Sequence, residues 1–549
     1  MLLKMKKVMI LVVILGIFVI GATAAEGAQP KNENSIIRMT EDWPTYFDPA
    51  VGSDFSDTIT LVNLYDSLVF PNPDGSIRPQ VATKWDISED GLTYKFYIRK
   101  GVKFHSGNEL TAEDIAFSMN RLVTIGEGYA YLYTGVIKSA TALDRYTVEF
   151  KLNNKFGPFV SSLIRLYIAE KQLVLANIDK TTDIYGEFGD YGKQWLLTND
   201  AGSGPYKLKD VKMEEYILGE KFDDYWDGWD KDAPDYFKLS GACEPTTVRT
   251  AMFRQEQEIT DELQPMENYE AMSKIEGIEV ASYINGNNFN LTLNTKKAPT
   301  DDIHFRKTLA YLIDYEVVAD KIYLYSKVSN GPVPANLPGA DNSLKLYKRD
   351  LEKAKEELKL SEYADKLKDY PVTLNWCAEA PEEEKVALLI QANCAELGIK
   401  VEITKKPFGA MIADAQTVDT TPNASLVFVA PSYIEAGGML KTRYHSSSTG
   451  TWEQMEWLQD SELDAQIEDA LATTDREERF KKYSEIQKKI IDLCPTVWLF
   501  DQAERRAYQA SYIYWPTAEM FKKEQTFIFP MGYNNYVHDM KVFPEKRSK

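Results

Sequence analysis

The chain has 549 residues, of which 44% are hydrophobic and 27% charged. This is the balance of a folded globular protein, and the length suits about three domains. The formal net charge is −20 and the sequence contains no basic stripe. Because nucleic-acid binding needs a concentrated positive surface, we expect no nucleic-acid partner.

The first 24 residues have the pattern of a secretory signal peptide. Three lysines precede an apolar run at 8–20, and Ala22-Thr23-Ala24 fits the A-x-A cleavage rule. The run is short for a membrane span, so an uncleaved anchor is the less favoured alternative. Cleavage before Ala25 removes the three lysines and takes the charge from −20 to −23. No cysteine lies near this site, so we expect an exported protein that is not a lipoprotein.

The mature chain opens with a predicted strand at 35–39, a loop at 41–55 and a helix at about 57–68. The loop contains Trp, Tyr, Asp, Pro and Gly residues. The segment 69–199 then mixes strand and helix signals. Its clearest strand is the alternating LTYKFYI at 92–98. Thr111 and Asp114 have the spacing of a capping box, which predicts the start of a helix.

The stretch 291–314 predicts a strand followed by a helix. Leu291 and Leu293 alternate with polar residues, which is typical of a half-buried strand. Asp301 and Asp302 then precede an apolar stripe at helical spacing, where carboxylates suit the helix dipole. We interpret this stretch as a strand that leaves one lobe and a helix that opens another.

The C-terminal half contains two further patterns. Strand, helix and strand signals at 372–403 predict a βαβ unit with a parallel strand pair. Thr474 with Glu477 forms a second predicted capping box, ahead of a striped helix.

Residues that could carry chemistry are few. The four histidines are scattered, and no catalytic, phosphate-binding or zinc motif occurs. We therefore expect no catalytic residues, no metal and no cofactor. The aspartates between 223 and 230 lack the spacing of a calcium loop, which favours a solvated turn. Of the four cysteines, Cys377 and Cys394 could pair, but free thiols are an equal alternative.

Five blocks of sequence resemble the family 5 extracellular solute-binding proteins, the periplasmic peptide, nickel and opine binding components of ABC importers. The first is VATKWDISEDGLTYKFYIRKGVKFHSGNELTAEDIAFSMNRL at 81–122, and the second is GSGPYKLKDVKMEEYILGEKFDDYW at 202–226. The stretch 291–314 is similar to the third block and 347–358 to the fourth. Residues 464–500 are similar to the last. The blocks occur in the family's order over nearly the whole mature chain.

The resemblance implies a mixed α/β fold of two lobes with a ligand cleft between them. Lobe I would comprise 25–68, 200–291 and 499–549, and lobe II would comprise 292–498. An extra subdomain would be inserted at 69–199. Closure would bend the crossing segments near 291–294 and 497–500. The resemblance also implies a periplasmic location, ABC permease transmembrane subunits as partners, and a monomer.

The sequence departs from the family in its second lobe. Peptide-binding members carry a Trp-x-x-Asp-Tyr motif whose aspartate meets the peptide's amino terminus. The corresponding stretch here, 425–444, contains neither residue. Glu435 is a candidate substitute, although an exposed loop acid is the favoured interpretation. A buried ammonium needs a charge partner, so the missing aspartate argues against an ordinary peptide with a free amino terminus. The ligand we expect is a peptide or peptide-like solute, and the alternative is an oligosaccharide. A secreted hydrolase is a remote third alternative.

Aromatic and polar residues of the two lobes are the candidate ligand contacts. Loops at strand ends are where α/β folds bind ligands, and aromatic faces suit apolar side chains and sugars. For each aromatic residue taken singly, packing in the core is the alternative. The candidates are Trp43, Tyr46, Ser53 and Asp54 in lobe I, and Tyr433, Tyr444 and Trp452 in lobe II.

Overall fold

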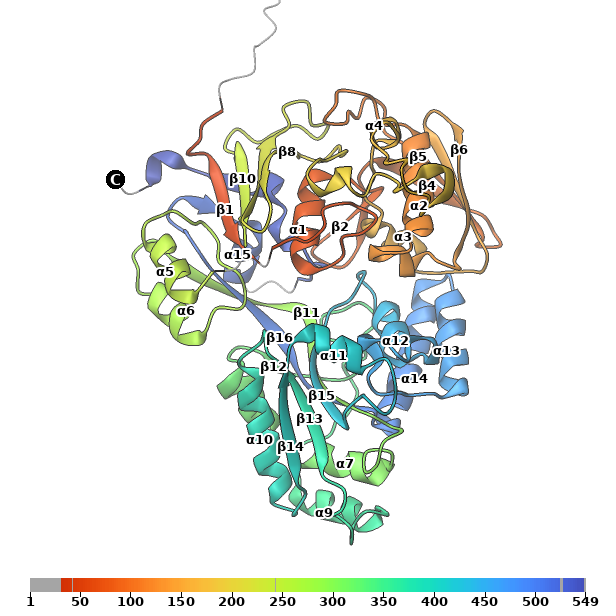
Figure 1. Cartoon of the computed structure of the whole chain (residues 1–549), viewed down its shortest axis with the longest axis vertical. Coiled ribbons are helices and arrows are strands. Elements are labelled where there is room, and N and C mark those ends of the chain that lie inside the picture. Colours follow the sequence, from red (N-terminus) through yellow and green to blue (C-terminus); the bar gives the residue numbers. More distant parts are fainter. Residues whose placement is uncertain (1–30, 42, 242, 524–526, 548–549) are drawn as a thin grey trace, which may run out of the picture.

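The computed structural model describes residues 31–41, 43–241, 243–523 and 527–547. The predicted signal peptide lies outside these residues. Figure 1 shows two bodies joined by the long strands β11 (Glu279–Leu293) and β16 (Thr496–Tyr508). We call the body that carries the first strand lobe I and the other lobe II. No helix among the described residues is long and apolar enough to cross a membrane.

Lobe I is built around a four-stranded sheet in the order β1-β10-β9-β8. The first pair is parallel and the other two are antiparallel. Gly219 in β9 faces the ring of Phe237, where an added Cβ would come within 2.0 Å of a ring carbon, so only glycine fits there. The strands are β1 (Ile36–Thr40), β8 (Tyr206–Lys212), β9 (Tyr216–Lys221) and β10 (Tyr236–Ser240).

The segment 69–199 carries its own antiparallel sheet, in the order β4-β5-β7-β6, and we call it the inserted region. The alternation predicted at 92–98 is confirmed, because Tyr94, Phe96 and Ile98 are buried on one face. The predicted capping box of Thr111 and Asp114 is also confirmed, at the start of α2. The strands are β2 (Val69–Pro71), β3 (Ile77–Pro79), β4 (Ala82–Ile87), β5 (Thr93–Ile98), β6 (Ile137–Asp144) and β7 (Thr147–Leu152).

Lobe II contains a six-stranded sheet in the order β12-β16-β11-β15-β13-β14. The predicted βαβ unit is present as β13, α10 and β14, and its two strands are parallel. The prediction of a half-buried strand at 291–293 is wrong, because residues 288–293 are all buried. β11 pairs with β15 and β16 on either side, and separate apolar clusters cover its two faces. The other strands are β12 (Lys327–Val328), β13 (Val372–Cys377), β14 (Val401–Lys406) and β15 (Ala424–Val429).

The helices lie around these sheets (Figure 1). The helix predicted at 57–68 begins two residues earlier, with Asp54 as its N-cap, and ends at Leu64. The prediction of a capping box by Thr474 and Glu477 is wrong, because the N-cap of α14 is Asp475, whose side chain accepts from the backbone of Glu478. The helices of lobe I and the inserted region are α1 (Phe55–Leu64), α2 (Ala112–Ile125), α3 (Phe159–Ser162), α4 (Lys171–Ala176), α5 (Pro245–Phe253), α6 (Met266–Met272) and α15 (Pro516–Lys522). Those of lobe II are α7 (Ile303–Leu312), α8 (Tyr315–Val317), α9 (Leu351–Leu360), α10 (Glu383–Ala395), α11 (Phe408–Asp414), α12 (Ala436–Tyr444), α13 (Ser461–Ala472) and α14 (Arg476–Leu493). Two short C-terminal strands, β17 (Ile513–Tyr514) and β18 (Lys541–Val542), pair with each other.

The cysteines and the acidic turn have ordinary structural roles. All four cysteines are free thiols, so the possible Cys377–Cys394 pair is not formed. Asp224 forms an ion pair with Lys103, at 2.8 Å. Within the described residues, no group of three or more His, Cys, Asp or Glu side chains could hold a metal ion.

Candidate functional site

The two lobes are joined by a pair of strands whose pairing has two irregularities. β11 and β16 pair from Glu279 opposite Tyr508 to Thr292 opposite Thr496 with two interruptions. Leu499 is skipped between the pairs Phe289–Phe500 and Asn290–Trp498, and residues 285–287 lie opposite Gln502. Gly286 at the centre of this bulge has φ +85°, in the left-handed region that favours glycine. A bulge interrupts the ladder and bends the strand. The larger irregularity, at 285–287, lies nearer lobe I than the segments predicted from sequence, whereas the smaller one, at Leu499, falls inside the predicted segment 497–500.

A second junction connects the inserted region to lobe II. The Tyr131 hydroxyl lies 2.6 Å from the Ser432 hydroxyl, and the ring of Phe156 packs edge-on against Tyr433. The backbone N–H of Gly157 donates to the carbonyl of Leu471, at 2.7 Å. Tyr131 itself remains 45% exposed, so an aromatic face is open to solvent where the lobes meet.

Arg165 lies at this junction as a buried cation without an anion. Its Nε donates to the carbonyl oxygen of Ser432 (2.8 Å), and its Nη1 donates to the carbonyl of Met531 (3.0 Å). The guanidinium also stacks over Tyr129, 4.8 Å from the ring centroid. Its Nη2 is buried without a hydrogen-bond partner, and no carboxylate of the described chain forms an ion pair with it. A buried guanidinium in this state is suited to receive an anionic group.

The loop before α1 brings two carboxylates close together beside this junction. Asp57 accepts from the backbone N–H groups of Tyr46 (2.9 Å) and Ser53 (3.0 Å). Burial, with the neighbouring Asp54 carboxylate as the next cause, raises the pKa of Asp57 to about 7. The Tyr129 hydroxyl donates to the carbonyl of Ser53 (3.2 Å), which ties this loop to the ring under Arg165.

A second group of acids surrounds the lobe I end of β16. Arg506 is fully buried and pairs with Glu262 (2.5 Å), Glu504 (2.6 Å) and Glu41. Burial raises the pKa of Glu41 well above its usual value, although Arg506 acts in the opposite direction. Burial likewise raises the pKa of Glu262 to about 7. Three carboxylates around one guanidinium leave an excess of negative charge when all are ionised.

Three of the contact residues predicted in lobe I, Tyr46, Ser53 and Asp54, lie beside Asp57. Tyr46 is 39% exposed, and Asp54 is exposed while it caps α1. Ser53 is half-buried and contributes its backbone, as described above. Trp43 is half-buried and packs on the lobe I core near Gly241.

Lobe II places its predicted aromatic residues deeper. Tyr433 and Tyr444 are each 1% exposed, and the Tyr444 hydroxyl accepts from Nε1 of Trp498 at 2.9 Å. This burial favours the packing alternative for both tyrosines. Trp452 is half-buried and packs edge-on against Phe408, with ring centroids 5.3 Å apart.

Glu435 is not the exposed loop acid that the sequence favoured. It is 1% exposed and holds Arg479 through two bonds, of 2.7 and 2.8 Å. It also accepts from the hydroxyl of Tyr483 (2.8 Å). Both of its oxygens are thus engaged inside lobe II, which leaves no free carboxylate to replace the motif's aspartate.

Sequence reasoning missed Tyr131, Arg165 and Glu453. Burial raises the pKa of the Glu453 carboxyl, with Arg443 acting in the opposite direction. The one available signal for Arg165 was its position in an apolar stretch, FVSSLIRLYIA at 159–169, because arginine is seldom buried without a partner.

Two α/β bodies joined by a pair of crossing strands are the two-lobed fold of periplasmic binding proteins. The family model of bacterial extracellular solute-binding proteins, family 5 Middle, matches residues 76–451. The chain belongs to this family. Its role is that of the substrate-binding component of an ABC importer, not of an enzyme.

Individual relatives cover most of the chain. The probable D,D-dipeptide-binding periplasmic protein DdpA of Escherichia coli (strain K12) is 27% identical over 493 residues, covering 87% of this chain and 90% of its own. Heme-binding protein A of Haemophilus influenzae is 26% identical over 509 residues, covering 87% and 88%.

Solved structures share the fold. The ABC transporter substrate binding protein CtaP of Listeria monocytogenes has a TM-score of 0.79 at 20% identity, covering 92% of this chain and 99% of its own. The periplasmic binding protein DppA of Helicobacter pylori, solved in complex with the peptide STSA, has a TM-score of 0.75 at 23% identity, covering 92% and 98%.

Proposed function

We propose that this protein captures a short peptide or peptide-like solute where the lobes meet and delivers it to the permease subunits of an ABC importer. It acts as a monomer in this proposal. Several relatives are named as dipeptide- or tripeptide-binding proteins, which supports the ligand class. The proposed lining comprises Tyr46, Ser53, Asp54 and Trp452, with Trp43 behind the loop. Tyr433 and Tyr444 support the wall from within lobe II.

The observation that carries the proposal is the unpaired guanidinium of Arg165. A peptide has a terminal carboxylate, which would supply the missing anion through a charge-assisted hydrogen bond to Nη2. A neutral oligosaccharide would leave this cation buried and unpaired, and that is costly. The arginine therefore favours the peptide over the sugar alternative.

The acids of lobe I supply the complementary sign. Burial raises the pKa of three of these carboxyl groups, those of Asp57, Glu41 and Glu262. An approaching ammonium would favour their ionised forms. A zwitterion with its charges at opposite ends fits this arrangement, and so the amino terminus can be held without the aspartate that lobe II lacks.

Calorimetric titration with matched ligands tests the proposal. The set comprises tripeptides, the same peptides with a C-terminal amide, N-acetylated peptides and neutral oligosaccharides. We expect the free peptides to bind, and each neutralised end to weaken binding by about tenfold or more. Saturable binding of an oligosaccharide, without binding of any peptide, would contradict the proposal.

The proposal also includes export and closure. We expect the mature chain to begin near Ala25 in the periplasm, which N-terminal sequencing of the purified protein checks. A start at Met1 with the protein in the membrane fraction would contradict it. Ligand would close the lobes by bending the crossing strands at the 285–288 bulge.

A further inference from the structure

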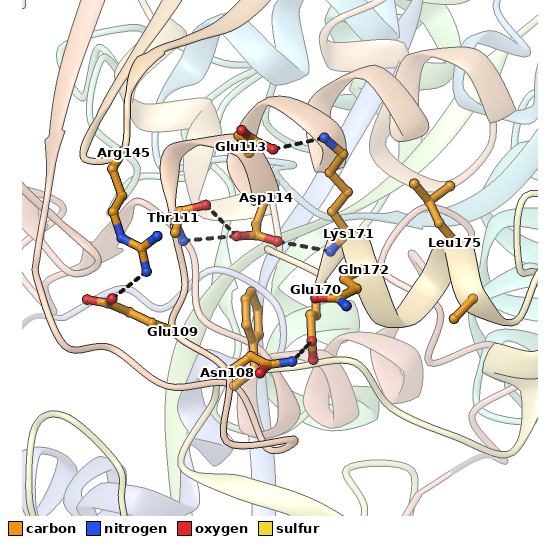
Figure 2. Close-up of a pocket in the computed structure, with 12 residues that line it drawn as sticks. Asn108, Glu109, Thr111, Glu113, Asp114, Arg145, Glu170, Lys171, Gln172 and Leu175 are labelled. Carbon is orange, nitrogen blue, oxygen red and sulfur yellow. Dashed lines mark hydrogen bonds and ion pairs between the residues drawn. The ribbon is translucent and has the colours of Figure 1, made fainter.

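A pocket of about 630 Å³ lies in the inserted region, on elements other than those of the lobe junction. Figure 2 shows its walls, formed by the loop before α2, the first turn of α2, the start of α4 and the turn between β6 and β7. Its volume is within the range of sites for small organic molecules. Nothing in the proposed transport site uses these residues.

Glu170 in the pocket wall is a buried carboxylate with one oxygen unused. The residue is 3% exposed. Its Oε1 accepts from the amide of Asn108 at 2.7 Å, whereas its Oε2 has no hydrogen-bond partner (Figure 2). It forms no ion pair with any described residue. A buried carboxylate with a single hydrogen bond is destabilising unless a cation or further donors complete it.

The basic side chains of the pocket are already paired to other acids. Lys171 pairs with Glu113 at 3.0 Å, and Arg145 pairs with Glu109 at 2.7 Å (Figure 2). These two pairs neutralise the rim of the pocket. Neither cation is therefore available to Glu170.

The other deep acid of the pocket, Asp114, is already satisfied. It accepts from the backbone and hydroxyl of Thr111, both at 2.9 Å, and from the backbone of Lys171 at 3.0 Å. Burial raises the pKa of Asp114, and the Glu170 carboxylate contributes in the same direction. The floor of the pocket thus carries uncompensated negative charge, and the open hydrogen-bond position is on Glu170.

We propose that this pocket is a second ligand site, which binds an aliphatic ammonium compound through Glu170. A primary ammonium has three donors, so it can complete Oε2 and lie between the Glu170 and Asp114 carboxylates. Leu175 in α4, the helix that Glu170 precedes, is half-buried in the pocket lining and offers an apolar surface to a short methylene chain. The ligand class is therefore a linear mono- or diamine.

Titration of the full mature chain with 1,4-diaminobutane tests the proposal. We expect saturable binding to the wild type and a loss of about tenfold or more in affinity in Glu170→Gln, which keeps the shape and the Asn108 contact. Glu89→Gln, the matched control, removes an equal charge from an exposed turn of the inserted region outside the pocket and should change the affinity by less than about threefold. The dianion glutarate should not bind.

Three outcomes would overturn the site. The first is no binding of the diamine to the wild type at about 10 mM, since a weaker affinity would be of no use for recognition. The second is equal affinity in Glu170→Gln and the wild type. The third is competition between the diamine and a bound peptide, which would place the amine where the lobes meet. The melting temperature of Glu170→Gln should equal or exceed that of the wild type, and a large decrease would mark Glu170 as a structural residue.

Discussion

Replacement of Arg165 by methionine should weaken peptide binding while leaving the free protein folded. Methionine is similar in length and apolar, so it fills the same buried space. In the bound state, the peptide carboxylate would lose its partner. Removal of one member of a buried, hydrogen-bonded charge pair costs about 2–5 kcal/mol, which corresponds to a loss of about thirtyfold or more in affinity.

The free protein should tolerate the change because removal of Arg165 leaves no carboxylate of the described chain without its ion-pair partner. Its bonds to the carbonyls of Ser432 and Met531 are each worth about 1 kcal/mol net. Loss of an unpaired buried charge offsets part of this. Arg121 is the matched control, because it is equally buried but holds Asp48 through two bonds, of 2.5 and 2.6 Å. Arg121→Met should lower stability by about 3–5 kcal/mol and leave the affinity of the folded fraction unchanged.

The assay is a double-mutant cycle by calorimetry, with one tripeptide as its free acid and as its C-terminal amide. In the wild type the acid should bind more tightly than the amide. In Arg165→Met the two affinities should converge. If the ratio of acid to amide affinity is the same in both proteins, Arg165 does not meet the carboxylate and the reasoning fails. Arg165→Lys should recover part of the difference, since it retains the charge but not the planar fork.

Three further outcomes are expected. The Glu262 carboxyl has a folded-state pKa of about 7, above its unfolded value, so its contribution to stability should fall as the pH rises between about 4 and 7. Denaturant unfolding of Glu262→Gln should show a shallower decline over that range, and an unchanged decline would be evidence against the assignment. Small-angle scattering should show compaction with saturating peptide, and Gly286→Val should hinder it because the bulge needs φ +85°; equal profiles with and without ligand argue against closure at the bulge. Trp43→Ala and Trp452→Ala should each reduce affinity by about tenfold, whereas a large loss of melting temperature with unchanged affinity would assign both to packing.

Local patterns predicted local structure well. The alternation in β5, the Thr111–Asp114 capping box and the βαβ unit each depend on residues close in sequence. The second capping box shows the limit of this reasoning. Thr474 and Asp475 both have a glutamate three residues later, and the carboxylate, the stronger acceptor, is the one that caps α14.

Tertiary contacts decided what the sequence could not. Thr292 and Asn294 made the stretch at 291–294 read as half-exposed, but both are buried. The carbonyl groups of Ser425 and Val418 accept hydrogen bonds from their side chains. The candidate site depends on longer separations still. The carbonyl groups that accept from Arg165 belong to residues 267 and 366 positions further along the chain, so no local sequence pattern predicts these contacts.

The last segment of the chain is attached to the first helix. Asn63 in α1 donates to the carbonyl of Asn535 at 3.1 Å and accepts from the backbone of Val537 at 2.9 Å. The core of lobe I is thus complete only after residues near 537 have been synthesised and have packed against α1. Contacts between residues so far apart in sequence form slowly. Lobe I therefore stays incomplete until the end of the chain is available, whereas most of lobe II lies between β11 and β16 and does not depend on the C-terminal residues. The order of folding therefore differs from the order of synthesis, because α1 is made early but its contacts with residues 535–537 form last.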